Sequence, residues 1–340
     1  MSFIKKITIK GHKLRLFLFL ILIPCFVLAE IGTEDYRKYH STKSKFKLEK
    51  SAQGLNYPWA LTFIDKVNVL ITEKDGGLYK VNVLTGGKEK IKHEIAHIGY
   101  DGSGQGGLLD VYFYPPDGYV YFTYSHKSSK LTRSKQISKK SSTAIARGRL
   151  IENEIKDFEI LLIAKPEFLE NRHYGSRLAI KGDDLFASFG ERGQGMISQD
   201  STKHPGSIIR IKTNGEIPKD NPRFKGKKDW LPEIYVIGVR NPQGITISPH
   251  DEEVYFSSHG PRGGDHIGQV EFGSNYGWKD IAWGGREYYG LGIGDAPFKD
   301  KYKKPLISWV PSMGISSIQF YEGEAFPEWR GDLLVASLNG

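Results

Sequence analysis

Two short segments in the C-terminal half carry groups that could bind an anionic ligand together with a metal ion. The segment 257–265 (SSHGPRGGD) follows an apolar run, and its Gly-Pro and Gly-Gly pairs force an irregular backbone with carbonyls available to a ligand. Backbone carbonyls beside a carboxylate, here Asp265, suit a hard cation such as calcium. Arg240 and Asn241, in the nearby segment 238–244 (GVRNPQG), add a guanidinium and an amide. The sequence therefore predicts a pocket for an anionic, metal-assisted ligand.

A strand–turn–strand unit recurs along the chain and would position these segments. Abundant glycine (39 residues) and 12% aromatic residues favour an all-β protein with many turns. Repeats of roughly 50–70 residues with several strands each predict the blades of a β-propeller. A β-sandwich is the alternative, but it would not require the same unit five times. The copies pair residues 59–63 with 69–72, 108–113 with 119–124, 177–180 with 185–189, 244–247 with 253–256, and 317–321 with 332–336.

The N-terminus is typical of a secretory signal peptide. A basic region that ends at Arg15 precedes a short apolar core, Leu16 to Leu28, and a small residue, Ala29, ends it. We expect cleavage before Glu30, with an uncleaved anchor as the alternative. The predicted divisions are thus a signal peptide (1–29), a polar lead-in (30–50) and a propeller domain (51–340). The expected location is periplasmic or secreted, with no stable membrane span after cleavage.

Removal of the signal changes the composition of the mature chain. The only cysteine, Cys25, lies inside it, which suits an oxidising compartment where no disulfide is needed. The signal also carries five Lys or Arg and no acidic residue, so the formal charge falls from +9 to +4. This weakens a nucleic-acid function, and we interpret the lysine clusters at 127–140 and 225–228 as solvated loops.

An ordered set of motifs in residues 50–340 resembles the soluble aldose sugar dehydrogenases, the glucose/sorbosone dehydrogenase family that uses pyrroloquinoline quinone (PQQ). That family is a six-bladed propeller with PQQ and calcium on one face. The resemblance therefore implies a sixth blade beyond Gly340, in a chain that is a fragment or stops early. The motifs are GQGGLLD (104–110), HYGSRL (173–178), GERG (190–193), RNPQG (240–244), HGPRGGD (259–265) and NYGW (275–278), with PWA (58–60) and WVPS (309–312) extending the match.

The resemblance implies roles for four polar residues. His173 would be the base that takes the proton of the sugar C1 hydroxyl, and an imidazole with a pKa of about 6.5 suits that task. Arg240 and Asn241 would contact the quinone end of PQQ, and Arg240 would act where negative charge develops. Gln105 would bind PQQ or orient the base. The alternatives are a loop histidine bonded to a carbonyl, an arginine that bridges blades, and an amide that caps a turn.

The resemblance also implies ligands for calcium. At several positions, however, this sequence differs from the family. Gly260 and Pro261 would each offer a backbone carbonyl to calcium, and Asp265 is associated with a second calcium. Asn339 falls where many relatives place a lysine that reaches PQQ. Arg172 falls where some relatives have an aspartate beside the base, and we expect it to lower the pKa of His173. The family's C-terminal arginines, which hold the PQQ carboxylates, are not in this chain.

Aromatic residues after the last glycine-rich loop have two expected roles. We expect Tyr276 and Trp278 to pack between blades. Trp283, Tyr288 and Tyr289 are candidates for stacking on sugar or quinone, and core packing is the alternative.

The predicted function is oxidation of the C1 hydroxyl of an aldose to the lactone. The predicted cofactors are PQQ and Ca2+, and the partners are a sugar and an external electron acceptor. A calcium-dependent propeller hydrolase of the lactonase type is one alternative. A non-catalytic propeller that binds a glycan or a protein is the other.

Overall fold

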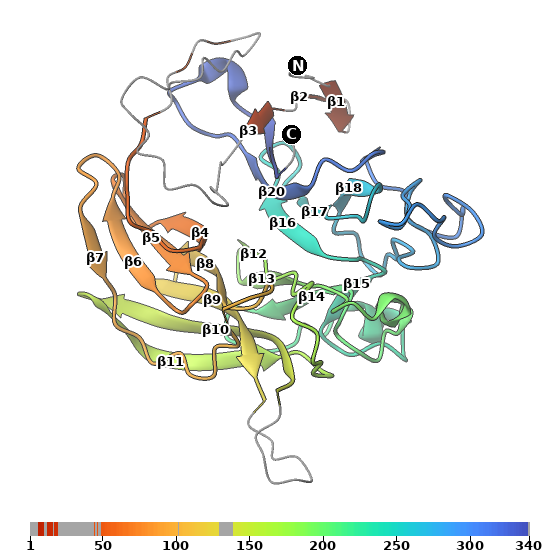
Figure 1. Ribbon diagram of the computed structural model, residues 1–340, viewed down its shortest axis with the longest axis horizontal. Helices are drawn as coiled ribbons and strands as arrows, with labels where there is room; N and C mark the ends of the chain where they lie inside the picture. Colours follow the sequence, from red (N-terminus) through yellow and green to blue (C-terminus); the bar gives the residue numbers. More distant parts are fainter. Residues whose placement is uncertain are drawn as a thin grey trace.

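The computed structural model describes residues 44, 46, 49–100, 102–128 and 139–338, and the backbone of strands at 6–9, 12–15 and 17–19. Four antiparallel four-stranded sheets stand side by side around a common centre (Figure 1). Within each sheet the strands follow chain order from the centre outward, and the innermost strands of neighbouring sheets contact each other. This arrangement is a β-propeller, so the predicted all-β propeller fold is confirmed.

The four complete blades divide the described chain from residue 58 to residue 309. The first consists of β4 (Pro58–Phe63), β5 (Asn68–Glu73), β6 (Leu78–Asn82) and β7 (Lys88–Lys90). The second consists of β8 (Leu108–Tyr114), β9 (Tyr119–Lys127), β10 (Ser141–Ile151) and β11 (Glu154–Ile163). The third consists of β12 (Leu178–Lys181), β13 (Asp184–Phe189), β14 (Ser207–Lys212) and β15 (Ile234–Ile237). The fourth consists of β16 (Pro242–Ile247), β17 (Val254–Ser258), β18 (Asp265–Gln269) and β19 (Ile307–Trp309).

A further sheet follows the fourth blade. It pairs β20 (Ile315–Phe320) with β21 (Leu333–Ser337), and β3 (Phe17–Phe19) lies parallel to β21. The hairpin of β1 (Lys6–Ile9) and β2 (His12–Arg15) is separate. Short 3-10 helices occur at η1 (Gly195–Gln199), η2 (Pro222–Lys225) and η3 (Pro327–Trp329). In the described part of the chain, none of the helices has the length and apolarity needed to cross a bilayer. The signal peptide and the polar lead-in remain predictions, and most of residues 1–50 lie outside the described residues.

Each predicted strand–turn–strand copy is the inner hairpin of a sheet. Aspartates stabilise three of the turns, because their carboxylates accept backbone N–H groups two residues on: Asp65 from Val67, Asp117 from Tyr119 and Asp251 from Glu253, at 2.8–3.1 Å. In two of these turns the second carboxylate oxygen also accepts a tyrosine hydroxyl on the returning strand. These hydrogen bonds in the turns help to fix the register of the hairpins. The alternation of apolar and polar residues in their strands was already visible in the sequence.

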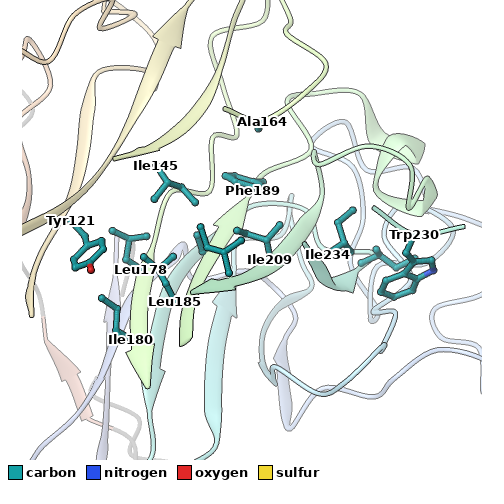
Figure 2. Close-up of a cluster of buried hydrophobic side chains, with 13 residues drawn as sticks. Tyr121, Ile145, Ala164, Leu178, Ile180, Leu185, Phe189, Ile209, Trp230 and Ile234 are labelled. Carbon is teal, nitrogen blue, oxygen red and sulfur yellow. The ribbon is translucent and has the colours of Figure 1, made fainter. Parts of the chain in front are cut away.

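Apolar side chains between the blades form the core. Figure 2 shows the cluster between the second and third blades, where Tyr121 and Ile145 meet Leu178, Leu185 and Ile209. All five side chains are at most 3% exposed. Burial of such a side chain contributes about 1.5–3 kcal/mol. Similar clusters fill the other three junctions between successive sheets, so the second, third and fourth sheets are each packed on both faces.

A repeated hydroxyl hydrogen bond fixes the spacing of the inner strands. In each complete blade, a Ser or Thr on the second strand donates its hydroxyl to a backbone carbonyl at the beginning of the next sheet's innermost strand. Three of these bonds are buried and the fourth, from Ser257, is partly buried, and all four join consecutive blades at the end where the candidate site lies. The pairs are Thr72 with Leu109 (2.6 Å), Thr123 with Ser176 (2.9 Å), Ser188 with Pro242 (3.1 Å) and Ser257 with Ser316 (2.5 Å).

Candidate functional site

The predicted site residues lie in loops at one end of the propeller. Gln105 precedes β8, His173 precedes β12, and Arg240 precedes β16. Glu191 follows β13, and Gly260 follows β17. The inner strands all begin at this end, and the antiparallel second strands finish there. The fold therefore brings together residues that are up to 155 positions apart in the sequence.

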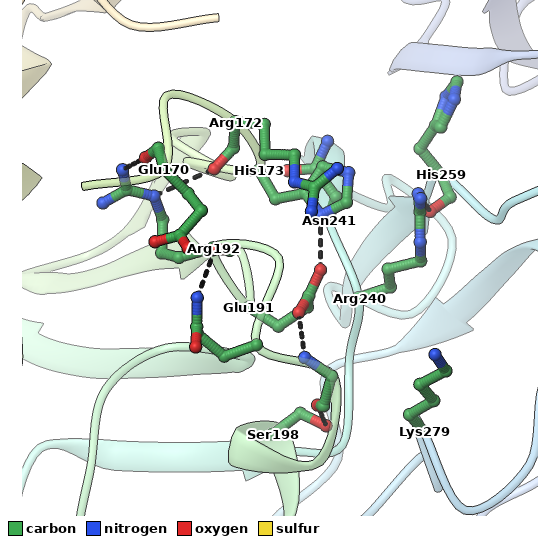
Figure 3. A network of polar contacts seen from close by, with 12 residues as sticks. Glu170, Arg172, His173, Glu191, Arg192, Ser198, Arg240, Asn241, His259 and Lys279 are labelled. Atoms are coloured by element: carbon green, nitrogen blue, oxygen red, sulfur yellow. Dashed lines mark hydrogen bonds and ion pairs between the residues drawn. The ribbon is translucent and has the colours of Figure 1, made fainter. Parts of the chain in front are cut away.

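His173 and Glu191 form a buried pair at this end (Figure 3). Nδ1 of His173 pairs with Oε1 of Glu191, whose side chain is 2% exposed. The other carboxylate oxygen accepts the backbone N–H of Gly195. An ionised carboxylate requires Nδ1 to carry the ring proton, so Nε2 is left with its lone pair. His173 is thus held in the tautomer that accepts a proton at Nε2.

Burial favours the neutral form of the His173 imidazole. Burial lowers the pKa of His173, with a smaller contribution from the cation of Arg240, while the bond to Glu191 opposes the shift. Arg172 contributes in the same direction as burial, as the sequence predicted. Burial is the largest single effect on Glu191 and raises its pKa, but the bond and charge of His173, the N–H of Gly195 and the charge of Arg240 together lower that pKa below its ordinary value. At neutral pH the pair therefore consists of a neutral base and a carboxylate.

The backbone that carries His173 is held from several sides. Its N–H donates to Oε1 of Gln105 at 2.6 Å. The guanidinium of Arg192 donates to the carbonyls of Glu170, Arg172 and Ser141 and lies 3.7 Å from the Tyr174 ring centroid. His173 itself has a φ of 53°, in the left-handed region that non-glycine residues rarely adopt. These contacts hold the base in a conformation that the local sequence does not favour.

Arg240 lies between the histidine pair and the segment that contains Gly260. Its Nη1 donates to the carbonyls of His259 (3.0 Å) and Gly260 (3.1 Å), and its own carbonyl accepts the N–H of Glu191 at 2.8 Å. The side chain is buried, with its guanidinium 5.9 Å from the Tyr288 ring centroid. The structure thus connects Arg240 to Glu191, the partner of the base, and to Gly260, one of the two carbonyls predicted to bind calcium.

A cavity of about 270 Å³ opens beside these residues. Two of its lining amides have defined orientations. Oε1 of Gln105 accepts the His173 N–H, and Oδ1 of Asn241 accepts the N–H of Gly175 at 3.0 Å. Their NH2 groups are therefore the ends left to interact with a ligand. The remaining lining residues are Trp59, Lys74, Gly104, Leu109, Tyr174, Gly175, Gln243, His259, Ile315, Ser316 and Leu338.

Two of the three metal ligands predicted in the segment 257–265, Gly260 and Asp265, have other partners. The Asp265 carboxylate accepts the N–H groups of Gly260 (2.6 Å), Met313 (3.1 Å) and Ile315 (2.9 Å) and is fully buried. This arrangement ties two loops together and gives no support to a metal role for Asp265. The Gly260 carbonyl already accepts from Arg240. Among the described residues there is no group of three or more His, Cys, Asp or Glu placed to hold a metal.

Behind Gly260 and Pro261 lies a second cavity of about 10 Å³, which is the size of one water molecule. Three of its lining residues, Ser258, His266 and Trp278, each carry a buried polar atom without a hydrogen-bond partner: Oγ, Nε2 and Nε1. Nδ1 of His266 pairs with the carbonyl of Gly264 at 2.9 Å, so its Nε2 is an acceptor. The indole N–H is a donor, and the hydroxyl is both.

We expect one ordered water in this cavity, because it would accept from Trp278 and donate to His266 while contacting Ser258. A high-resolution crystal structure would show its density within hydrogen-bond distance of all three atoms. An empty cavity, or direct bonds among the three side chains, would contradict this expectation.

The aromatic residues divide only partly as the sequence suggested, because Trp283 belongs with the buried group. Tyr276 is buried in the cluster between the third and fourth blades, as predicted, whereas Trp278 is buried against Ala282 and Ile293 of the loop that follows it. Trp283 is also buried and donates its indole N–H to the Tyr276 carbonyl, so core packing describes it better than ligand stacking. Tyr288 and Tyr289 are 62% and 73% exposed, and only Tyr288 lies near Arg240.

One predicted residue lies outside the described part of the chain, and two others were missed. Asn339 is not among the described residues. Glu191 lies in the GERG motif, but nothing in the sequence indicates that it pairs with His173, 18 positions earlier. Lys74 looked like an ordinary lysine after a strand, yet it lines the cavity.

Comparisons with known proteins identify the family of this chain. The family model described as glucose/sorbosone dehydrogenase matches residues 55–340. A relative named aldose sugar dehydrogenase YliI, from Escherichia coli, is 33% identical over 296 residues, which cover 84% of this chain and 76% of the relative. Quinoprotein glucose dehydrogenase B of Acinetobacter calcoaceticus is 25% identical over 77% of this chain and 58% of the relative.

Solved structures show the same likeness. A crystal structure of the soluble aldose sugar dehydrogenase from Escherichia coli, in its apo form, matches with a TM-score of 0.77 and 31% identity. The match covers 86% of this chain and 83% of that chain. The propeller, the loops gathered at one end and the extent of the family match together show that this chain belongs to the glucose/sorbosone dehydrogenase family.

Proposed function

We propose that the protein oxidises the C1 hydroxyl of an aldose to the lactone, with PQQ as the oxidant and an external acceptor for the electrons. The observation that carries the proposal is the buried pair of His173 and Glu191 at the face of a propeller of this family. The names of two relatives, an aldose sugar dehydrogenase and a quinoprotein glucose dehydrogenase, support the substrate class and the cofactor.

His173 would remove the proton of the C1 hydroxyl. Its Nε2 has the lone pair, and Glu191 at Nδ1 stabilises the imidazolium that forms. Loss of the proton and of a hydride from C1 leaves a carbonyl, which in the cyclic sugar is the lactone. A neutral histidine at rest is the required starting state, and burial provides it by lowering the pKa of His173.

Arg240 would stabilise the negative charge that develops on the oxidant's oxygen. A guanidinium is always charged and presents planar donors. It is fixed by the carbonyls of His259 and Gly260, and its backbone is bonded to Glu191. The base and the electrophilic cation are therefore positioned by one connected set of hydrogen bonds.

The described cavity lining fits a ligand such as PQQ, a tricarboxylate with quinone carbonyls. The NH2 groups of Gln105 and Asn241 are donors, Lys74 is a cation, and Trp59 offers an aromatic face. When bound, PQQ supplies the two-electron oxidant that the protein's own side chains lack. Gln105, Asn241, Arg240 and Lys74 are the described residues that would hold it, and Asn339 remains a predicted contact.

Calcium fits the described residues less well. A calcium ion at the carbonyls of Gly260 and Pro261 would compete with the Arg240 guanidinium, and the Asp265 carboxylate is directed to backbone N–H groups. We therefore derive no step through calcium. The predicted ion remains a prediction, and its contribution is measured by repeating the assay below with a chelator in place of added calcium.

The test is reconstitution of the purified protein. With PQQ, calcium and glucose or another aldose present, we expect reduction of a redox dye and formation of the corresponding lactone. Omission of PQQ is expected to abolish both. The proposal would fail if the PQQ-loaded protein reduced no dye with a panel of aldoses, or if it hydrolysed lactones without the cofactor.

Two finer features also remain proposals. We propose a six-bladed propeller, on the basis of the motifs that resemble the glucose/sorbosone dehydrogenase family; four complete sheets and a further one are described. We also propose a periplasmic or secreted location, on the basis of the N-terminal sequence. N-terminal sequencing of the protein from periplasmic extracts would test the location, and a mature chain that starts before residue 30 would contradict the predicted cleavage.

A further inference from the structure

A further set of contacts lies behind the carboxylate of Glu191. The N–H of Gly195, the first residue of η1, donates to Oε2 of Glu191. Ser198 of the same short helix is 1% exposed and lies on the side of Glu191 away from His173 (Figure 3). Its hydroxyl donates to the carbonyl of Trp278, in the loop that follows β18. The donor that Glu191 uses is therefore held by a contact with the fourth blade.

Two side-chain amides join η1 to that loop. Nδ2 of Asn275 donates to Oε1 of Gln199 at 2.8 Å, and Nε2 of Gln199 donates to Oδ1 of Asn275 at 3.1 Å. Nε2 of Gln199 also donates to the Trp278 carbonyl at 2.6 Å. Oδ1 of Asn275 accepts the N–H of Gly277 at 2.8 Å, and this backbone donor fixes which end of the amide faces it. The two amides thus form a reciprocal pair with a defined orientation.

The same contacts reach the segment that carries Arg240. The N–H of Gly238 donates to the Ser198 carbonyl at 2.8 Å. A Cβ at Gly238 would lie 2.0 Å from Oδ1 of Asn275, so the close approach of this segment to the amide pair requires glycine. Two residues later, the Arg240 carbonyl accepts the N–H of Glu191 at 2.8 Å. The amide pair therefore lies where the segments that carry Glu191 and Arg240 meet.

We propose that Gln199 and Asn275 are positioning residues for the general base. Their pair fixes η1, the Gly195 N–H fixes the Glu191 carboxylate, and that carboxylate holds His173 with its ring proton on Nδ1. Neither amide is among the described residues that line the 270 Å³ cavity, so both act through Glu191 and not on a ligand. The geometric part of the inference stands without the proposed function, and only its effect on catalysis rests on it.

The kinetic test is a double-mutant cycle. Gln199→Met keeps the length of the side chain but removes the hydrogen bonds of the pair, and it is expected to lower kcat for aldose oxidation roughly 10-fold. Glu191→Gln has already lost the charge that the pair positions. In that background Gln199→Met is expected to lower kcat by no more than about a further 2-fold, because both substitutions act on one contact. Losses that simply multiply, as for a general structural defect, would overturn the inference.

Proton NMR of the protein without cofactor tests the inference with no turnover. The Nδ1–H of His173 is bonded to a carboxylate, and its far-downfield resonance is assigned by its loss in His173→Asn. Gln199→Met and Asn275→Leu are each expected to shift or broaden this resonance, because Glu191 is no longer held in place. An unchanged resonance in both variants would overturn the inference.

The matched control for Asn275→Leu is Asn221→Leu. Asn221 is also an amide that joins loops, because its Nδ2 donates to the carbonyls of Arg210 and Pro232 in the third blade, at 2.9 Å each. This variant is expected to lower the thermal stability but to keep the wild-type His173 resonance and kcat. A control that changed the resonance as much as Asn275→Leu would count against the inference, since the effect would then be general.

The two readouts separate this inference from the proposed function. If the resonance depends on Gln199 and Asn275 but the PQQ-loaded protein oxidises no aldose, the positioning role stands and the proposed function falls. If the resonance is independent of both amides while the wild type oxidises aldoses, the inference falls alone. Hydrogen exchange of the Gly195 N–H in the wild type decides the matter even if neither variant folds. Slow exchange is expected for an N–H held against a carboxylate, and exchange as fast as that of an exposed loop amide would overturn the inference.

Discussion

His173→Asn is expected to lower kcat for aldose oxidation about 10²- to 10⁴-fold, the contribution of a positioned general base. Asparagine tolerates the left-handed backbone conformation that His173 adopts, whereas alanine would add strain. The loss would therefore report the missing Nε2 lone pair rather than a distorted loop. Steady-state dye reduction by the PQQ-loaded variant measures the effect.

The matched control for this substitution is His97→Asn. His97 also has a positive φ, 61°, but its side chain is exposed and lies outside the cavity lining. This variant is expected to keep the wild-type kcat. PQQ binding by His173→Asn is expected to be nearly unchanged. A His173→Asn protein with normal binding and wild-type kcat would remove His173 from the catalytic role.

Glu191→Gln has the second largest expected effect, a loss of kcat of roughly 10²- to 10⁴-fold. The amide keeps the shape of the side chain but removes the charge that stabilises the imidazolium of His173. The sign of the pH effect also follows. Glu191 raises the pKa of His173 against the larger effect of burial, so its neutralisation lowers that pKa further.

The pH profile separates this positioning role from a merely structural one. A general base becomes inactive when it is protonated, as the pH falls through its pKa. Because the pKa of His173 is lowered, the midpoint of the acid limb of kcat/KM for the wild type should lie below the ordinary histidine pKa of about 6.5. In Glu191→Gln the limb should move to still lower pH. The control is Glu233→Gln, which alters a buried pair with His204 (2.6 Å) away from the site. A reduced kcat in Glu191→Gln with no change in the limb would contradict the assigned role.

The inner hairpins could be predicted because local chemistry dictates them. Alternating apolar residues and turns built on Asp or Gly recur in every copy, and the structure places each predicted pair in the centre of a sheet. The outer strands carry weaker signals. The three residues of β7, Lys88–Lys90, are all exposed, so no buried face marks them as a strand.

The motifs made it possible to predict which residues belong to the site. They did not predict which partners these residues contact, because those contacts depend on long-range packing. Asp265 is an aspartate, as many metal ligands are. Its carboxylate, however, accepts the backbone N–H groups of Met313 and Ile315, which lie 48 and 50 residues later in the sequence. Lys74 reaches the Gly104 loop 30 residues on only because the first two blades pack together. The pairing of His173 with Glu191 likewise depends on β13 returning to the face where β12 began.

The central claim is that this protein removes a proton and a hydride from C1 of an aldose, with His173 as the base. The most direct measurement is a single turnover of PQQ-loaded protein with glucose and no acceptor, followed by the absorbance of the oxidised cofactor. We predict rapid loss of that absorbance, a slower rate with glucose deuterated at C1, and a rate at least about 100-fold lower in His173→Asn. Persistence of the oxidised spectrum with every aldose tested, or a rate unaffected by both deuterium and the substitution, would contradict the account.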